Sequence, residues 1–494
     1  MPLPKVMGSE IEYGIAVQGD LDFDPISSCV LLVNAYQETD VARILWDYDQ
    51  ENPLADARGF HVEGEKYTPN QQENIARNKT LMNGARFYVD HAHPEYSTPE
   101  VTNVRDLIAY ERAGERTMEA ARRAASLLLP AGQTLLLHKN NSDRKGNSYG
   151  NHENYLISRR IPFKDIVAHL TPFLVTRQIF CGAGKVGSEN RAAPCQYQIS
   201  QRSDFFETEV ALDTMVKRPI INTRDEPHAD REKYRRLHVI IGDSNMSEPS
   251  TYLRVGVTSI VLALIEDGFI GRDLSIGDPV KVVKEISHDL ACKRVFPMDR
   301  GGRMSAIQVQ QEYLELALQY FGSREIDPIT KDVLTRWERV LTRLAEDPMQ
   351  LDREIDWVIK RRLIQRYVES KGVDWENPQV QMLDLQYHDI RPDKGLYFLL
   401  ERRGEVDRII SNEDIEAALL GPPSDTRAYF RGECIRRYPD AIFGVNWDSI
   451  SFNMGDEPVK RILMNEPLKG TRSHVEQLLR DCEDAATLVD ALTA

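Results

Sequence analysis

The sequence predicts an α+β fold with one large domain and a small carboxy-terminal one, on three observations. A chain of 494 residues is longer than a single ordinary core. The expected strands and helices follow one another without strict βαβ alternation, which argues against a doubly wound parallel sheet. Gly421, Pro422 and Pro423 form the clearest linker signal. We therefore expect a large domain over residues 1–420 and a small one over residues 421–494.

Apolar runs and alternating patterns predict the strands. Residues 6–17 form the first, with Glu10 and Glu12 on one face and Ile11 and Tyr13 on the other. Further strands are expected at residues 85–91, 134–139, 195–201 and 237–241.

Apolar residues at helical spacing predict the helices. One is expected over residues 104–125, and a buried one over residues 251–266, with Ser247 and Ser250 as capping candidates. Residues 308–368 are largely helical in pattern and highly charged.

Residues from about 38 to 80 are polar and irregular, with prolines and glycines spread along them. Such a segment is too long for an ordinary connection in a compact domain. We therefore expect a mobile insertion in the large domain with a functional role.

Composition excludes several classes of protein. A net charge of −15 argues against a general nucleic-acid binder. The longest apolar stretch, residues 255–265, is too short to span a bilayer, and residues 1–8 lack the design of a signal peptide. The six cysteines are far apart with no CxxC pair, which is typical of reduced thiols. We expect a cytoplasmic protein.

Polar residues on strand faces are the candidates for chemistry. Glu10 and Glu12 alternate with an apolar residue, so both carboxylates project from one face and provide part of a site for a hard cation such as magnesium. Arg86, Tyr88 and Asp90 share a face in the same way. The alternatives are an exposed polar face for the first pair and a salt-bridged structural strand for the second set.

Several nearby residues extend this set. Glu95, Ser97 and Thr98 follow the second strand and suit a metal ion and phosphate oxygens. We interpret His91 and His93 as loop residues, because a zinc site needs a third partner that the spacing does not supply.

Weaker candidates occur later in the chain. His152 and Asn154 lie on one side of their segment, and His238 lies at the head of an apolar strand. Arg202 and Arg224 could each clamp a phosphate with two hydrogen bonds. For each of these residues alone, a partner in the core or at the surface is the alternative.

Familiar catalytic motifs do not occur in the sequence. There is no P-loop, no kinase-type glycine loop and no GxSxG elbow, and GAGKVG at residues 182–187 is interpreted as a turn. What remains is a sheet surface rich in carboxylates and arginines, consistent with metal-assisted phosphoryl and acyl chemistry.

Several blocks of sequence together resemble the Dop family. They are GSEIEYG, NGARFYVDHAHPEYSTPE, YGNHENYL, QRSDFFETEV, INTRDEPHADREKYRRLHVIIGDSN, LDLQYHDIRPDKGLY, and DTRAYFRGEC followed by NWDSI. Dop enzymes are the Pup deamidases and depupylases of bacteria that couple this protein modifier to a proteasome. They and their sister, the Pup ligase, resemble glutamine synthetases and carboxylate-amine ligases. The resemblance implies a curved, mostly antiparallel sheet in a catalytic domain, followed by a small carboxy-terminal domain.

The resemblance also implies roles for individual residues. The implied magnesium ligands are Glu10, Tyr88, Glu95, His152 and His238, with Glu12 as a further one. The implied nucleotide contacts are Arg86, Ser97, Thr98, Asn154, Trp447 and the backbone of Ile240, Ile241 and Gly242. Asp90 matches the catalytic aspartate. Arg202 and Arg224 are expected to hold phosphate or the developing oxyanion.

The implied activity is hydrolysis of the terminal glutamine amide of Pup and of the isopeptide bond that joins Pup to a lysine. Bound ATP, or ADP plus phosphate, and magnesium are the implied cofactors. Asp90 would attack the carbonyl itself or activate a water or phosphate nucleophile. The expected partners are Pup and pupylated proteins, without nucleic acid or membrane, and we expect a monomer.

Two features favour the Dop family over the Pup ligase. They are the insertion at about residues 38–80 and the run Asp-His-Ala-His-Pro-Glu at residues 90–95. The alternatives are an ATP-consuming Pup–protein ligase or another carboxylate-amine ligase, and a non-catalytic nucleotide-binding scaffold that recruits Pup.

Overall fold

A computed structural model describes residues 4–37, 44–49, 51–64, 68–213, 217–455 and 457–493. Its centre is a six-stranded sheet in the order β15-β10-β1-β8-β7-β6, and every neighbouring pair in it is antiparallel. The strands are β15 (Tyr234–Gly242), β10 (Asn151–Ser158), β1 (Met7–Glu12), β8 (His93–Ser97), β7 (Arg86–Asp90) and β6 (Asn78–Thr80). The predicted α+β class with a mostly antiparallel sheet is confirmed.

The first predicted strand divides into two. Residues 7–12 form β1 in the central sheet, whereas β2 (Gly14–Gln18) pairs with β9 (Thr134–His138) in a separate sheet. The chain turns at Gly14, where a Cβ atom would overlap the hydroxyl of Tyr149. The prediction of one continuous strand over residues 6–17 is therefore wrong, although the faces assigned to Glu10 and Glu12 are right.

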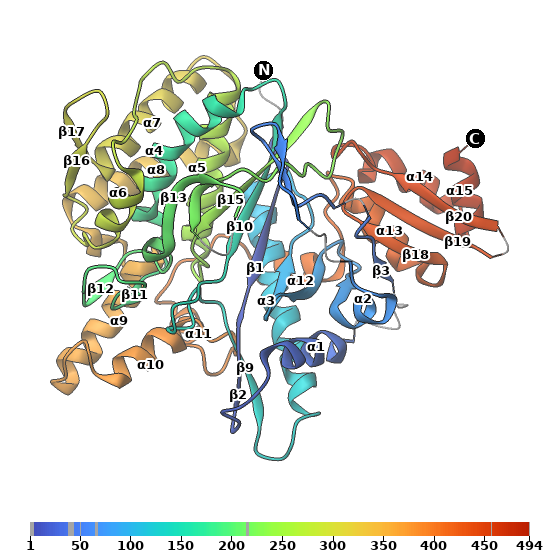
Figure 1. Cartoon of the computed structure of the whole chain (residues 1–494), viewed down its shortest axis with the longest axis horizontal. Helices are drawn as coiled ribbons and strands as arrows, with labels where there is room; N and C mark the ends of the chain where they lie inside the picture. Colours follow the sequence, from blue (N-terminus) through green and yellow to red (C-terminus); the bar gives the residue numbers. More distant parts are fainter. Residues whose placement is uncertain are drawn as a thin grey trace.

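A layer of helices covers one side of the sheet (Figure 1). It contains α4 (Phe163–Cys181), α5 (Glu248–Glu266), α6 (Pro279–Ser287), α7 (Ala306–Phe321) and α8 (Pro328–Glu346). Leu237 and Val239 of β15 belong to the same buried cluster as these helices. The predicted helix over residues 251–266 is confirmed but begins earlier, because the hydroxyl of Ser247 caps it.

The same apolar face of the sheet continues against α3 (Val104–Ser126) and α1 (Pro25–Ala35). Ile11 and Phe87, which point away from the polar face, are fully buried in this second cluster. The polar residues between them therefore have to face the other way.

The remaining elements are shorter, and one of them corrects a prediction. The strand expected at residues 195–201 shrinks to β12 (Tyr197–Gln198), because the next amides bond elsewhere: Ile199 to the carbonyl of Ser287 at 2.8 Å and Gln201 to Asp243 at 2.8 Å. The others are β11 (Lys185–Val186), β13 (Phe206–Ala211), β14 (Arg218–Asn222), β16 (Val295–Pro297), β17 (Arg303–Ser305), α9 (Asp356–Lys371), α10 (Pro378–Tyr387), α11 (Leu396–Arg402) and α12 (Asn412–Leu420).

The chain after residue 421 forms a separate small sheet with helices. Its elements are α13 (Ala428–Arg437), β18 (Ile442–Asn446), β19 (Ser449–Met454), β20 (Glu457–Leu463), α14 (Arg472–Asp481) and α15 (Ala485–Thr493). The fourth strand of this sheet is β3 (Leu45–Trp46), which pairs in parallel with β18. Trp46 is 1% exposed in the core of this region. The small unit thus contains a strand from the segment assigned to the insertion.

That segment is more regular than the sequence predicts. Residues 38–43, 50 and 65–67 lie outside the described part of the chain. Besides β3, the segment contains the hairpin of β4 (Ala55–Asp56) and β5 (Phe60–His61), then α2 (Gln71–Arg77) and β6. Asn70 and Glu73 form a capping box that begins α2. The prediction that the irregular insertion extends to residue 80 is therefore wrong at that end, because β6 belongs to the central sheet.

No helix in the described ranges is long and apolar enough to cross a membrane.

Candidate active site

Strand β1 places Glu10 and Glu12 in the middle of the polar face of the sheet. Glu10 lies opposite Ser97 on β8 and His152 on β10, and Glu12 lies opposite Glu95 on β8. The period of two residues along a strand therefore joins side chains from three strands on one face.

Glu10, His152 and His238 form the first of two clusters that could hold a cation. Their ligand atoms all lie within 4.8 Å of one another, and Glu10 Oε2 is 3.1 Å from His152 Nδ1. Burial holds the pKa of His238 well below its usual range. Burial would raise the pKa of Glu10, but His238, His152 and Arg236 together hold it well below its usual range. Glu10 is thus ionised beside two imidazoles.

Glu12, Asp90 and Glu95 form the second cluster, with carboxylate oxygens within 4.8 Å of one another. Burial, followed by the charges of Asp90, Glu10 and Glu12, raises the pKa of Glu95 well above its usual range. Glu95 is 2% exposed, and its Oε1 has no hydrogen-bond partner among the described residues. A buried carboxylate in this state is costly unless a cation or proton compensates it.

The pKa of Glu12 is shifted in the opposite direction from that of Glu95. Burial would raise its pKa, but a hydrogen bond from His93, the charge of His152 and the backbone N–H of Gly150 at 2.8 Å lower it to about 2. The residues of both clusters fit a divalent cation. The second cluster offers only oxygens, as magnesium prefers, and the first mixes oxygen with imidazole nitrogen.

Tyr88 and Arg86 on β7 complete this face. The Tyr88 hydroxyl is 3.4 Å from Ser97 Oγ, and burial raises the pKa of Tyr88 well above its usual range, so the phenol is neutral. The Arg86 guanidinium lies 3.9 Å from the ring centroids of both Trp46 and Tyr88 and donates to Asn78 at 3.0 Å. The structure thus encloses Arg86 with aromatic rings beside the metal-type residues.

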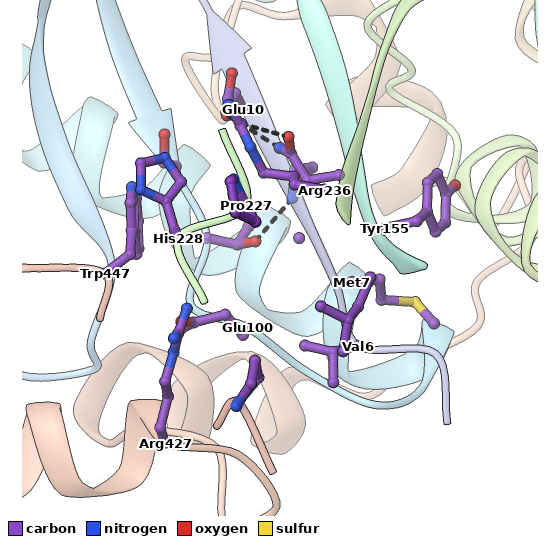
Figure 2. Close-up of a pocket in the computed structure, with 17 residues that line it drawn as sticks. Val6, Met7, Glu10, Glu100, Tyr155, Pro227, His228, Arg236, Arg427 and Trp447 are labelled. Carbon is purple, nitrogen blue, oxygen red and sulfur yellow. Dashed lines mark hydrogen bonds and ion pairs between the residues drawn. The ribbon is translucent and has the colours of Figure 1, made fainter. Parts of the chain in front are cut away.

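A pocket of about 580 Å³ opens on the Glu10 side of the sheet. Figure 2 shows Trp447 and His228 together on one side of it, with Val6 and Met7 across from them. Four predicted nucleotide contacts line it together: Ser97, Thr98, Asn154 and Trp447.

The predicted contacts at residues 240–242 lie elsewhere. The carbonyls of Ile240 and Gly242 accept hydrogen bonds from Arg202, and Ile241 lines a separate small cavity beneath the sheet. Asn154 is paired with His238, whereas Gly242 is paired with Asn151, so the pocket meets the other end of β15. Four residues of strand span about 13 Å. Ile240, Ile241 and Gly242 therefore do not line the pocket that holds the other predicted nucleotide contacts.

A groove of about 1830 Å³ opens on the Glu12 side, and Asp90 lies in it. Asp90 is the last residue of β7, its side chain is 39% exposed, and its Oδ2 is 3.0 Å from His91 Nδ1. Glu12 and His152 also line this groove, whereas Glu10 lines the pocket. The two carboxylate clusters therefore lie between the pocket and the groove.

Two arginines lie near Asp90. Arg202 lines the groove and is 1% exposed, and burial together with Arg218 lowers its pKa to about 10. Arg224 follows β14, and its charge helps to lower the pKa of His238. The Nε of Arg224 is buried without a hydrogen-bond partner in the part of the chain that the structure describes. Both are placed to meet an anion near the clusters.

Sequence reasoning missed Arg236, His228, Glu100 and Arg427, which line the pocket. Arg236 could have been found, because it stands two residues before His238 on the same face of one strand. The other three come from a loop, a strand end and the carboxy-terminal region, and no local pattern connects them.

Comparisons with known proteins place this chain in a family. The family described as Pup-ligase protein matches residues 5–451. A depupylase of Acidothermus cellulolyticus is 51% identical, covering 99% of this chain and 99% of its own length. A Pup deamidase/depupylase of Mycolicibacterium smegmatis is 44% identical, covering 99% of this chain and 100% of its own. A Pup–protein ligase of Actinosynnema mirum is also 44% identical, but covers 81% of this chain and 90% of its own.

Two solved structures share the fold. The ligase PafA in complex with the prokaryotic ubiquitin-like protein Pup has a TM-score of 0.82 at 34% identity, covering 97% of this chain and 92% of that chain. PafA in complex with ADP has a TM-score of 0.75 at 35% identity, covering 86% of this chain and 96% of that one. From the family match and these relatives, this chain belongs to the Pup-ligase protein family.

Proposed function

We propose that this protein is a hydrolase that converts the carboxy-terminal glutamine of Pup to glutamate and cleaves the Pup–lysine isopeptide bond. One observation carries the proposal: Asp90 lies at the end of β7, exposed in an open groove, with a carboxylate oxygen within 4.8 Å of those of Glu12 and Glu95. A carboxylate in this position can reach a chain end from solvent and stay next to bound cations.

The hydrolase is favoured over an ATP-consuming ligase by the extent of similarity. The depupylases match 99% of this chain, whereas the Pup–protein ligases match 81%. The scaffold alternative is disfavoured because Asp90 is accessible and surrounded by a full set of metal-type ligands.

The Trp447 pocket supports a bound nucleotide. It combines an apolar wall with hydroxyls, an amide and Arg236, which suits a flat base attached to a polar chain. Its position next to Glu10 would direct phosphates toward the two clusters. We assign ATP, or ADP plus phosphate, as the nucleotide, in line with the ADP in the PafA structure.

Magnesium fits the residues of the two clusters. Glu12, Glu95 and Tyr88 would supply oxygen ligands, and Glu10, His152 and His238 would hold the second position. When bound, the metal supplies positive charge that stabilises developing negative charge on oxygen.

Both reactions break an amide at the same side-chain carbonyl, so one site serves both. Asp90 either forms a bond with the carbonyl carbon or takes a proton from the water that does so. Arg224, whose Nε has no partner among the described residues, stabilises the oxyanion of the tetrahedral intermediate. The intermediate collapses with loss of ammonia from the glutamine, or of the lysine amine from the conjugate. Where Asp90 itself is the nucleophile, this leaves a mixed anhydride with Asp90, which water then hydrolyses to restore the free aspartate. Water is consumed and a carboxylate remains in each case.

A single incubation tests the proposal. Glutamine-ending Pup, ATP and magnesium are mixed with the protein, and products are followed by mass spectrometry and nucleotide analysis. We expect glutamate-ending Pup and ammonia without stoichiometric ATP consumption. In a parallel incubation with glutamate-ending Pup and a lysine-containing protein, an isopeptide formed with one ATP consumed per bond would establish a ligase. Pup that stays bound and unchanged in both incubations would establish a scaffold.

A further inference from the structure

Two arginines in the groove have no acidic partner among the residues that the structure describes. Arg202 and Arg218 both line the groove that contains Asp90, and neither forms an ion pair with a described carboxylate within 4.0 Å. Arg202 is buried and Arg218 is half-buried, whereas the buried Arg177 is paired with Glu153 at 2.6 Å. Buried charges are normally paired or bound to an ion. This pair therefore indicates an anion supplied from outside the chain.

The two guanidinium groups are held side by side by one residue. Arg202 Nε donates to Ser148 Oγ at 3.2 Å, and Arg218 Nη2 donates to the main-chain oxygen of Ser148. Arg202 Nη1 donates to the carbonyls of Ile240 and Gly242. All of these acceptors are neutral, so they fix the guanidiniums without neutralising their charge.

Burial lowers the pKa of both arginines, and Arg218 adds to the effect on Arg202. Glu12 is the carboxylate that most opposes this lowering for each of them, and it also lines the groove. The pair thus lies on the groove side of the acid cluster, where an incoming anion would meet two cations.

We propose that Arg218, together with Arg202, binds the free α-carboxylate of the terminal residue whose side-chain amide is cleaved at Asp90. The inference rests on the proposed function. Glutamine-ending Pup and a Pup–lysine conjugate differ in the leaving amine but share this α-carboxylate, which lies a few bonds from the scissile carbonyl. Guanidinium groups bind carboxylates with two parallel hydrogen bonds. Such a site would accept both substrates and reject a glutamine inside a chain.

A carboxylate of the tag is favoured over a phosphate of the nucleotide by position. Arg202 and Arg218 line the Asp90 groove, whereas Ser97, Asn154 and Trp447 line the pocket on the other side of the clusters. A group bound between the arginines would therefore enter with the substrate.

The test compares two substrates in two enzymes. The tag is prepared with a terminal glutamine as the free acid or as the α-carboxamide, and side-chain deamidation is followed by mass spectrometry. We expect the intact enzyme to disfavour the carboxamide by about 10- to 100-fold in kcat/KM, the range for a hydrogen-bonded charge. In Arg218→Gln, kcat/KM should fall by a similar factor for the free acid and change little for the carboxamide.

Two further variants make the result interpretable. Lys145→Gln removes one positive charge from the same groove and should lower kcat/KM for both substrates by the same small factor. Arg218→Lys retains charge without the planar fork and should recover part of the selectivity. Thermal unfolding and nucleotide binding check that Arg218→Gln is folded.

Two outcomes would overturn the inference. One is an intact enzyme that cleaves both substrates equally well. The other is an Arg218→Gln variant that loses equally on both and binds nucleotide more weakly, which would assign the arginine to a phosphate. An intact enzyme that deamidates neither substrate would instead overturn the proposed function, so the two failures are distinguishable.

Discussion

Four carboxylates converge on one face of the central sheet, from Glu10, Glu12, Asp90 and Glu95. His238, His152 and Arg236 hold the pKa of Glu10 well below its usual range. His93, His152 and Gly150 hold the pKa of Glu12 at about 2. For Glu95, burial and the neighbouring carboxylates outweigh a hydrogen bond from Tyr88 and raise the pKa, and its Oε1 has no partner within the described ranges. It is therefore the residue at which the need for a cation is greatest.

Replacing Glu95 by Gln should separate stability from function. In magnesium-free buffer we expect a higher unfolding temperature, because the variant removes a buried carboxylate that its neighbours repel. Magnesium-dependent nucleotide binding should weaken by at least about 10-fold through loss of a ligand. Calorimetry and titration measure the two quantities.

The matched control for this variant is Glu325→Gln, which changes an exposed carboxylate outside both clusters and the pocket. An unfolding temperature that falls in Glu95→Gln, with magnesium-dependent binding unchanged, would remove Glu95 from the metal site.

At the scale of elements, the segment between β2 and β6 is attached to the strand that ends near Arg224. Ala57 N–H donates to the carbonyl of Thr223 at 2.8 Å, and the Thr223 hydroxyl donates to Asp56 at 2.5 Å. The hairpin of β4 and β5 thus fixes the residue that precedes Arg224.

We expect Asp56→Ala to lower kcat for deamidation by roughly 10-fold or more, because a small displacement of a catalytic group has effects of this size. Nucleotide affinity should be unchanged, since the Trp447 pocket does not contain this hairpin. Arg58→Ala is the control. It removes the other partner of the Asp56 carboxylate and leaves the hydrogen bond between Thr223 and Asp56 in place. Equal kinetics in Asp56→Ala and the intact enzyme would contradict this account of the hairpin.

A second link between elements joins the sheet to the carboxy-terminal region. Glu100, just after β8, pairs with Arg427 at 2.8 Å and with Arg431 of α13. Burial would raise the pKa of Glu100, but Arg431 and Arg427 lower it from 4.5 to about 2. Arg431 also donates to the carbonyl of Trp447 at 2.9 Å, so the link fixes one wall of the nucleotide pocket.

This link predicts a pH dependence of stability. A depressed carboxyl pKa stabilises the fold above pH 4.5, and the contribution is lost as the pH falls from there toward 2. The size is about 3 kcal/mol for a shift of this extent. Chemical unfolding across this range should show an acid-side decline in the free energy of unfolding that is smaller by this amount in Glu100→Gln and unchanged in Glu476→Gln, an exposed control. A decline that is the same in all three proteins would contradict the assignment.

Local residue patterns predicted which side chains share one face of a strand. They did not predict which strands pair or in which register. The face shared by Glu10 and Glu12 follows from a period of two residues and is confirmed. The position of Ile240–Gly242 depends on the register between β15 and β10, which no local pattern contains. The same holds for β3, whose two residues complete a sheet nearly 400 positions later in the chain.

At the scale of the whole molecule, the polar face of the central sheet carries two openings, and the two clusters lie between them. The pocket beside Glu10 is closed by Trp447 of the carboxy-terminal region, and the groove beside Glu12 is bordered by β2 and the loop at residues 142–150. The central strands run between the helical layer and the small sheet in Figure 1. This arrangement lets a cofactor and a chain end approach the same carboxylates from different sides.

The central claim is that one site, centred on Asp90, hydrolyses both the glutamine amide and the isopeptide bond. The most direct measurement compares Asp90→Asn with the intact enzyme on glutamine-ending Pup and on a Pup–lysine conjugate, with nucleotide and Pup binding measured in parallel. We predict that both cleavage rates fall together, by roughly 10²- to 10⁴-fold, while both affinities are retained. Substantial cleavage of either substrate by Asp90→Asn would contradict the account.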